Sequence, residues 1–97
     1  LSAFPAVRRD LAVTLPAGVA ASAVEAAIRG RASALLEHVA LFDVYAGRGV
    51  EAGRRSLAWA FRFRAPDRTL TDEEVEAEMQ GITDVLEERF DARVRAS

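Results

Sequence analysis

The chain has 97 residues, a net charge of −2 and no cysteine. This length predicts one domain with a single compact core, and the lack of cysteine excludes disulfides and thiolate metal sites and is compatible with a reducing compartment. There is no run of about 18 apolar residues and no basic-then-apolar leader, so neither a membrane span nor a signal peptide is predicted. Because it starts at Leu1 and its only methionine is Met79, we expect it to be a piece of a longer protein.

The charge is distributed unevenly along the chain. Positions 1–68 carry ten arginines and six acidic residues, whereas positions 69–97 carry three arginines and nine acidic residues. The basic part contains the expected strands, and the acidic part is mostly one helix. The negative total therefore does not exclude nucleic-acid binding by the basic part.

The first expected element is a strand over positions 7–15. Its residues alternate with a period of two, which predicts one apolar face and one face of charged and small residues. The second face comprises Arg8, Asp10, Ala12 and Thr14. Arg9 falls on the apolar side, so we predict a structural ion pair for it at the sheet edge. We expect Asp10 to orient neighbouring arginines.

A turn cluster at positions 16–18 separates this strand from the next element. A helix is expected over positions 20–31, where Ser22 and Glu25 form a candidate capping box. A second strand is expected over positions 38–45. It is followed by a glycine-rich loop that continues through Gly53.

The third expected strand covers positions 56–64 and has the clearest alternation. Its apolar side is Leu57, Trp59, Phe61 and Phe63, and its other side is Ser56, Ala58, Ala60, Arg62 and Arg64. After Pro66 a second helix is predicted, with Thr71 and Glu74 as its capping box. Its apolar stripe is Val75, Met79, Ile82 and Leu86. A short last strand over positions 92–95 ends the chain.

Two strand–helix–strand halves of this kind predict an α+β fold. The expected architecture is a ferredoxin-like βαββαβ sandwich, in which four antiparallel strands carry both helices on one face. The other face of the sheet is then open to solvent or to a partner, and several nucleic-acid modules bind bases on such a face.

Four ordered motifs give the chain a family resemblance. They are FPAVRRDLA at positions 4–12, LFDVY at 41–45, GRRSLA at 53–58 and RTLTDEEV at 68–75. Together they resemble the ferredoxin-fold anticodon-binding domain, which closes the beta subunit of bacterial phenylalanyl-tRNA synthetase and the monomeric organellar enzyme. The likeness covers nearly the whole chain, positions 1–97, as a single anticodon-binding domain.

The resemblance implies that this domain binds RNA and is located in the cytoplasm. The domain would grip the anticodon stem-loop of phenylalanine tRNA, beside the remaining domains of the beta subunit and the catalytic alpha subunit of a heterotetramer. ATP, magnesium and phenylalanine would be handled by catalytic domains absent here. For this chain itself we predict no cofactor, no catalysis and no membrane contact.

Strand parity selects the residues for base recognition. If Phe42 and Val44 point to the core, Asp43 and Tyr45 face outward, and a β-bulge near Phe42 would change this assignment. Small residues such as Ala12 let a flat base approach the backbone, and an aromatic ring stacks on it for about 1 to 3 kcal/mol. An ionised carboxylate accepts from N1 and N2 of guanine, the first anticodon base of the family's tRNA. The predicted set is Ala12, Asp43, Tyr45 and Ser56.

Arginines are the candidates for phosphate contacts, which position RNA without recognising its sequence. The predicted set is Arg8, Arg48, Arg54, Arg55, Arg62 and Arg64. Other roles remain open for several residues. Tyr45 fits a half-buried edge aromatic, Asp43 fits a cap of the glycine loop or an arginine partner, and any single arginine fits a solvated side chain.

Other functions remain as alternatives. His38 is the only histidine and, without cysteine, it supplies no convincing metal set, so we expect it in solvent or at a loop edge. An amino-acid-binding regulatory module with the same topology would usually form dimers. A protein-docking domain would carry a large apolar patch on the open sheet face. The interleaving of arginine with alanine and serine favours RNA over both.

Overall fold

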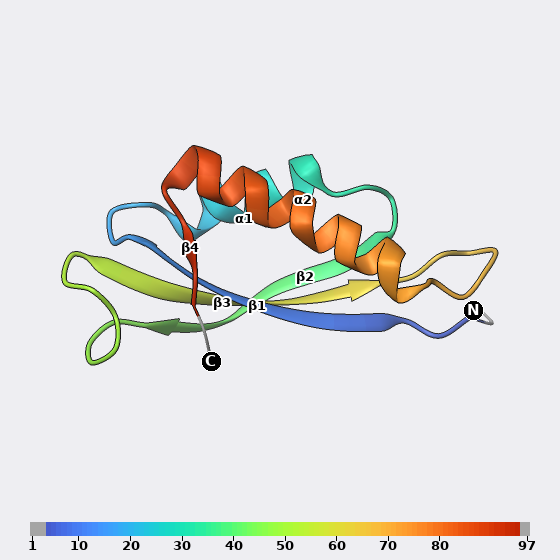
Figure 1. Cartoon of the computed structure of the whole chain (residues 1–97), viewed down its shortest axis with the longest axis horizontal. Coiled ribbons are helices and arrows are strands. Elements are labelled where there is room, and N and C mark those ends of the chain that lie inside the picture. Colours follow the sequence, from blue (N-terminus) through green and yellow to red (C-terminus); the bar gives the residue numbers. More distant parts are fainter. Residues whose placement is uncertain (1–3, 96–97) are drawn as a thin grey trace.

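The computed structural model describes residues 4–95. Its elements are β1 (Val7–Pro16), α1 (Ala21–Arg31), β2 (Leu36–Tyr45), β3 (Arg54–Phe63), α2 (Asp72–Phe90) and β4 (Arg93–Val94). The strands form one antiparallel sheet in the order β2-β3-β1-β4. Both helices cover the same face of this sheet (Figure 1). The predicted ferredoxin-like βαββαβ sandwich is confirmed.

The strand boundaries differ from the predicted ones by at most two residues. Pairing with β1 extends β3 back to Arg54, which lies opposite Pro16, and pairing with β3 extends β2 back to Leu36, which lies opposite Phe63. The last strand is shorter than predicted, because β4 pairs only with Val13 and Thr14 of β1. Within the described residues, β4 therefore pairs with only a short part of the outer edge of β1.

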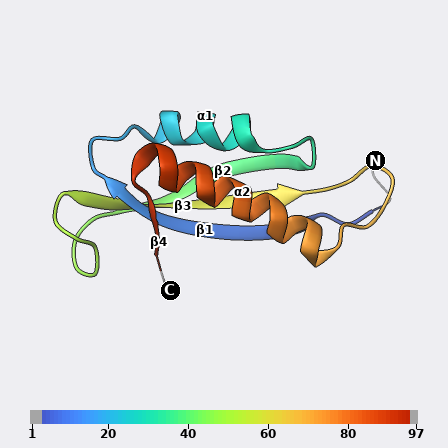
Figure 2. The ribbon, with the colours of Figure 1, turned by 45° about the horizontal axis from the view of Figure 1, so that its top comes forward.

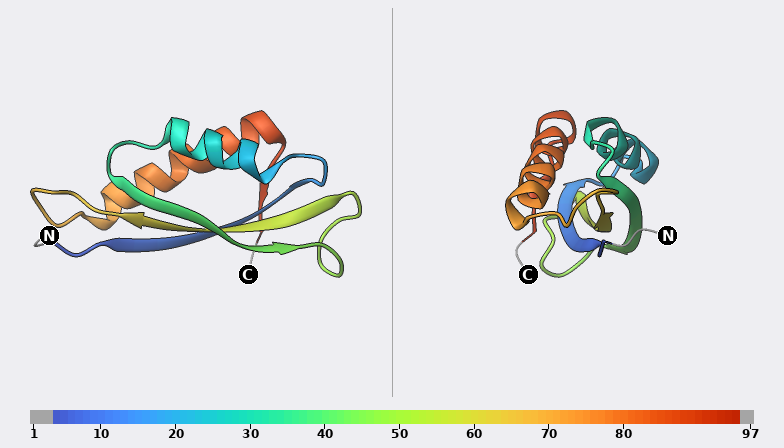
Figure 3. Two further views of the ribbon diagram at one scale, coloured as in Figure 1. Left: turned by 180° about the vertical axis from the view of Figure 1, so that it is seen from behind. Right: turned by 90° about the vertical axis from the view of Figure 1, so that its right-hand side faces the viewer.

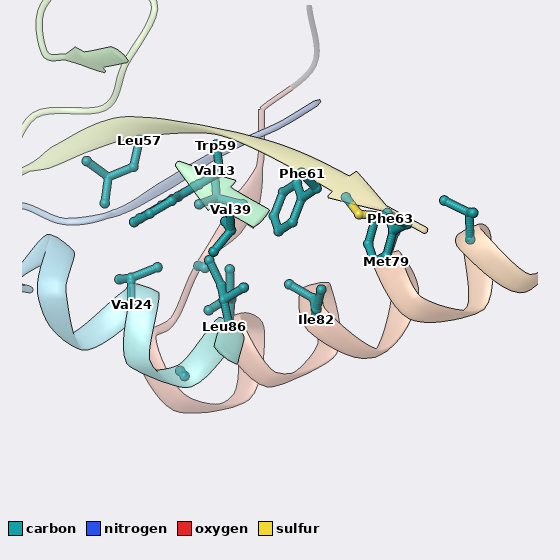
Figure 4. Packing of buried hydrophobic residues seen from close by; sticks show 14 of the residues in the cluster. Val13, Val24, Val39, Leu57, Trp59, Phe61, Phe63, Met79, Ile82 and Leu86 are labelled. Atoms are coloured by element: carbon teal, nitrogen blue, oxygen red, sulfur yellow. The ribbon is translucent and has the colours of Figure 1, made fainter. Parts of the chain in front are cut away.

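The hydrophobic core lies between the sheet and the two helices. The large side chains Trp59, Phe61 and Phe63 project from β3 toward the helices and are almost fully buried. Figure 4 shows Val24 of α1 and the α2 side chains packing against them. All four residues of the predicted α2 stripe are buried, namely Val75, Met79, Ile82 and Leu86. The apolar faces predicted from a period of two in the strands and of 3.6 in the helix thus form this core.

The two helices begin differently. Thr71 caps α2 by accepting from the backbone N–H of Glu74 at 3.2 Å, and the Glu74 carboxylate accepts from the Thr71 N–H at 3.2 Å. This capping box is confirmed. The one predicted at Ser22 is wrong, because α1 starts after Ala20 without a side-chain cap and Glu25 instead pairs with Arg29 at 3.1 Å.

The face of the sheet opposite the helices carries no helix (Figure 3). The hairpin between β2 and β3 extends past the ends of the helices, and β4 descends from the end of α2 beside β1 (Figure 2). Neither helix in the described part of the chain is long and apolar enough to cross a membrane.

Candidate nucleic-acid interface

Strand pairing arranges the helix-free side of the sheet in rows of neighbouring residues. Opposite residues of antiparallel strands point to the same side, so the residues that pair with the outward-facing positions of β3 share its face. We call this side the open face. Its rows are Thr14–Ser56–Tyr45, Ala12–Ala58–Asp43, Asp10–Ala60–Ala40 and Arg8–Arg62–His38, each given in the order β1, β3, β2. The assignment predicted for β1 and β3 is confirmed.

A β-bulge in β2 decides which of its residues reach the open face. Leu41 lies opposite Trp59, but the next paired residue of β2 is Asp43, opposite Ala58, so Phe42 is the extra residue. This bulge brings Asp43 and Tyr45 to the open face, as predicted. The reason given for the prediction was wrong, since Phe42 is 57% and Val44 50% exposed and neither belongs to the core.

Asp43 and Tyr45 lie beside a strip of small residues. Ala12 and Ala58 pair directly in the neighbouring strands and separate Asp43 from the β4 edge. The Asp43 carboxylate is exposed, and within residues 4–95 it has no hydrogen bond or ion pair. The alternative roles as a loop cap or an arginine partner are therefore not found. Ser56 is only 3% exposed and forms part of the floor.

The Tyr45 side chain has two contacts. Its hydroxyl donates to the carbonyl oxygen of Arg48 at 2.8 Å, and the guanidinium carbon of Arg95 lies 5.1 Å from the ring centroid. Since the Arg95 N–H donates to the Ala12 carbonyl at 2.8 Å, this arginine reaches from the β4 edge of the sheet to the ring on β2. The ring face therefore already accommodates a flat cationic group. The sequence reasoning missed Arg95, because only the tertiary pairing brings it near Tyr45.

Four of the six predicted phosphate-binding arginines are accessible. Arg8 and Arg48 are exposed, and within the described residues their guanidinium groups have no ion pair. Arg62 and Arg64 each donate to Glu37 at 2.7 Å, and their side chains remain 36% and 27% exposed. These hydrogen bonds, first from Arg62 and then from Arg64, hold the pKa of Glu37 below its usual value.

The other two predicted phosphate ligands are engaged inside the domain. Arg54 is 8% exposed, and its guanidinium donates to the Thr14 carbonyl at 2.8 Å and to the Asp91 carboxylate at 3.1 Å. Arg55 is half-buried on the helix side of the sheet and donates to the Val19 carbonyl at 2.8 Å. Because both groups are committed to internal partners, we assign them structural roles and no longer expect them at phosphate.

The charged triplet of β1 separates into different roles. Arg9 pairs with Glu76 at 3.2 Å and with Asp72 at 3.6 Å, so the predicted structural ion pair is confirmed, and its partners lie on α2. The orienting role predicted for Asp10 is wrong, because no hydrogen bond or ion pair within the described residues involves its side chain. His38 is exposed as expected, but it lies on β2 in the open-face row of Arg62, not in a loop.

The described residues contain no group of three or more histidine, aspartate or glutamate side chains that could hold a metal ion. What the open face does offer is an alanine floor with a free carboxylate, an aromatic ring and accessible arginines. Such a surface suits flat, hydrogen-bonding groups attached to an anionic backbone.

Comparison with known proteins gives the same assignment as the motifs. The family model described as "Ferredoxin-fold anticodon binding domain" matches residues 2–95. The phenylalanine–tRNA ligase beta subunit of Moorella thermoacetica is 50% identical over 95 residues, which is 98% of this chain and 12% of that protein. The corresponding subunit of Nocardia farcinica is 54% identical over 77 residues (79% of this chain, 9% of that protein), and that of Acinetobacter baylyi is 44% identical over 97 residues (100% and 12%).

The chain therefore spans only about a tenth of the length of these relatives. The family match covers nearly all of it and agrees with the fold and with the open face described above. This chain belongs to the ferredoxin-fold anticodon-binding domain family.

Proposed function

We propose that this chain is the anticodon-binding domain of a phenylalanine–tRNA ligase beta subunit, and that its open face holds the anticodon stem-loop of phenylalanine tRNA. The family match and the names of the relatives support this proposal. On this proposal the domain positions the tRNA and does no chemistry. Activation of phenylalanine with ATP and magnesium belongs to other domains of the beta subunit and to the catalytic alpha subunit of a cytoplasmic heterotetramer.

One observation carries the proposal, which is the free carboxylate of Asp43 at the end of the Ala12–Ala58 strip. An exposed aspartate without a partner, next to residues too small to block a flat ligand, leaves room for a base at the level of the backbone. Two adjacent N–H groups of a guanine edge satisfy the two oxygens of such a carboxylate. Asp43 thereby favours guanine, which offers N1 and N2 together.

Tyr45 supports the same base from the neighbouring row. Its ring stands two residues from Asp43 on the same face, and stacking of a base on such a ring contributes about 1 to 3 kcal/mol. The Ser56 hydroxyl lies at the bottom of this row, where it can donate or accept. Ala12, Asp43, Tyr45 and Ser56 thus remain the proposed base-recognition set.

Phosphate contacts come from the accessible arginines on this proposal. Arg8 lies at one end of the open face, and Arg48 lies in the loop at the other end, between two glycines with φ of 127° and 88°. Arg62 and Arg64 share Glu37, which neutralises part of their charge, and Arg64 also donates to the Phe4 carbonyl at 2.6 Å, so Arg62 keeps more of its N–H groups for an anion. Such contacts strengthen binding to any RNA sequence.

The distribution of exposed apolar residues argues against a docking domain. Val44 pairs with Leu57 and Val94 pairs with Val13, so both belong to the helix side of the sheet. Phe42 is exposed singly at the bulge, and Tyr45 is the one large aromatic residue in the open-face rows, whose other members are small, polar or charged, so the described residues form no large apolar patch there. An amino-acid-binding regulatory module makes a different prediction, namely a dimer whose melting temperature rises with phenylalanine. Gel filtration and thermal unfolding with and without phenylalanine test this alternative.

Binding of the chain to a phenylalanine-tRNA anticodon stem-loop at low salt tests the proposed function. We expect weak binding, because an intact synthetase holds its tRNA at several sites, and we expect weaker binding still when the first anticodon base is changed. Equal affinity for the two stem-loops would contradict base recognition by Asp43 and Tyr45. If neither stem-loop binds, the domain has a docking role instead.

A further inference from the structure

The half of the open face away from Tyr45 contains a hollow of about 210 Å³. Its walls include Arg8 and Asp10 from β1, His38 and Ala40 from β2, and Ala60 and Arg62 from β3. These residues form two complete neighbouring rows of the sheet, Asp10–Ala60–Ala40 and Arg8–Arg62–His38. The hollow is smaller than the roughly 300 Å³ of the smallest pockets for drug-sized ligands, so it suits a single flat ring system.

One row of this hollow has the same composition as the Ala12–Ala58–Asp43 row, but its carboxylate lies on the other side of β3. In the Ala12–Ala58–Asp43 row, the carboxylate lies on β2 and the two alanines lie on β3 and β1. In the Asp10–Ala60–Ala40 row, the carboxylate lies on β1 and the two alanines lie on β3 and β2. The two rows are two residues apart along β3, about 6.6 Å. The carboxylates therefore face each other diagonally across two rows of alanine.

The groups around the second hollow are free to take a ligand. Within residues 4–95, no hydrogen bond or ion pair involves the side chain of Arg8, Asp10 or His38. All three residues are exposed, and they line the same hollow. Asp10 is exposed, so water solvates its carboxylate and no internal ion pair has to be broken before it accepts from a ligand. Histidine rings and guanidinium planes both stack on bases.

We propose that this hollow is a second nucleotide subsite, which takes a splayed-out base bearing an exocyclic amino group, with Asp10 accepting from that amino group and His38 stacking on the ring. This inference rests on the proposed binding of an anticodon stem-loop. Uracil is disfavoured, since its single N–H lies between two carbonyl oxygens that repel a carboxylate. Four-stranded sheets of RNA-binding modules hold two or three bases side by side, so the open face has room for a second base.

The test removes single amino groups from the RNA and the carboxylate from the protein. Each adenosine of the anticodon loop is replaced in turn by purine riboside, and each guanosine by inosine, so that one exocyclic amino group is removed at a time. With the unchanged chain we expect a loss of affinity of about fivefold to tenfold at the first anticodon base and at one further loop position. In Asp10→Ala the loss at the further position disappears, whereas the loss at the first base remains.

Two matched variants complete the design. Glu87→Ala removes an exposed, unpaired carboxylate from α2 and changes the net charge equally, so it reports the general electrostatic effect on RNA binding. His38→Ala removes the stacking ring from the same hollow, and we expect it to weaken binding without changing discrimination at the first base. Circular dichroism confirms that each variant is folded, which is expected because neither Asp10 nor His38 has an internal partner.

The outcomes separate this inference from the proposed function. Preserved discrimination at the first base, together with identical base profiles for Asp10→Ala and Glu87→Ala, would overturn the second subsite alone. Absence of binding by any stem-loop would overturn the proposed function and the second subsite with it. The subsite is established if affinity no longer depends on the amino group at the further loop position in Asp10→Ala, whereas Glu87→Ala keeps this dependence.

Discussion

Tyr45 combines a structural contact and an accessible ring in one side chain. The hydroxyl closes the β2–β3 loop through the Arg48 carbonyl, and the ring lies against the Arg95 guanidinium on the open face. The two functions are separable, because phenylalanine keeps the ring and removes only the hydroxyl. A comparison of two substitutions at this position therefore distinguishes stacking from loop support.

We expect Tyr45→Phe to bind the anticodon stem-loop nearly as well as the unchanged chain. Tyr45→Ala should lose about 1 to 3 kcal/mol of binding free energy, because the stacking surface is gone. Fluorescence anisotropy with a labelled stem-loop measures both affinities. Equal losses in the two variants would mean that the hydroxyl, and not the ring, matters for RNA.

Arginines in this chain differ in role according to their partners, and Arg54 is the clearest example. Arg54→Ala should lower the free energy of unfolding by about 2 kcal/mol, since it removes charge-assisted hydrogen bonds between β3, Thr14 and the end of α2. Arg48→Ala is the matched control, an exposed arginine whose removal should change stability by less than about 0.5 kcal/mol. Urea unfolding measures both, and similar values would contradict the structural assignment of Arg54.

At the scale of the elements, α2 contains an interior glycine in its buried face. A Cβ at Gly81 would overlap with a terminal nitrogen of Arg31, which lies at the end of α1. Glycine thus leaves room for a long side chain from the neighbouring helix. The cost is a backbone with more freedom in the unfolded state.

Gly81→Ala should leave the domain equally stable or stabilise it by up to about 1 kcal/mol. The gain in helix propensity has this magnitude, and the side chain that must move is the flexible end of an arginine without an ion pair in the described residues. Thermal unfolding of Gly81→Ala, with Gly81→Ala/Arg31→Ala as the control, tests this. A marked loss of stability that the double variant reverses would contradict this expectation and show that the new methyl group clashes with an Arg31 side chain that does not move away.

Acid should destabilise the first turn of α2 and the start of β2. Hydrogen bonds from Arg68 and from the Thr71 backbone lower the pKa of Glu74, and Arg62 and Arg64 lower that of Glu37, both from a usual value of 4.5. Below pH 4.5 the unfolded chain binds these protons more readily, so stability is full above this pH and falls as the pH decreases through the folded-state pKa values.

Replacing Glu74 by glutamine should therefore flatten the loss of stability on acidification. The melting temperature of Glu74→Gln should be lower than that of the unchanged chain at pH 7, and the difference should shrink toward pH 3. Calorimetry across this range measures it. The control is Glu73→Gln, an exposed neighbour without a partner in the described structure, which removes a carboxylate from the same turn and leaves the capping box intact.

The whole molecule is electrostatically polar. The acidic α2 lies on one side of the sheet (Figures 1 and 3). The pairing of β1 with β3 assigns Arg8 and Arg62 to the other side, the open face. A polyanion is therefore attracted to the open face and repelled from the helical side, despite the net negative charge.

Salt dependence of RNA binding tests this polarity. Arg8→Ala and Arg48→Ala should each weaken binding of all stem-loops alike, and each should reduce the slope of log affinity against log salt by about 0.7 to 0.9. Arg29→Ala, on the helical side in an ion pair with Glu25, should change neither quantity. An equal change in Arg29→Ala would place the RNA on the wrong side of the sheet.

Local patterns were sufficient to predict the fold and half of the candidate site. The alternation in β1 and β3 depends only on neighbouring residues, and it correctly placed Ala12 and Ser56 on the open face. The α2 capping box was equally local. Arg54 and Arg55 were predicted as phosphate ligands, and parity gave no sign of their internal partners, which lie 37 and 36 residues away in the chain.

The sequence alone determined the order of elements, the core and the charge asymmetry, because these follow from periodicity, capping and composition within short segments. Only the tertiary structure decided the rest. The bulge at Phe42 exists only in register with β3, and it places Asp43 and Tyr45 on the open face. The Arg95 contact and the Asp10–His38 hollow likewise join residues from different strands, and such neighbours are set by packing and pairing over long chain separations.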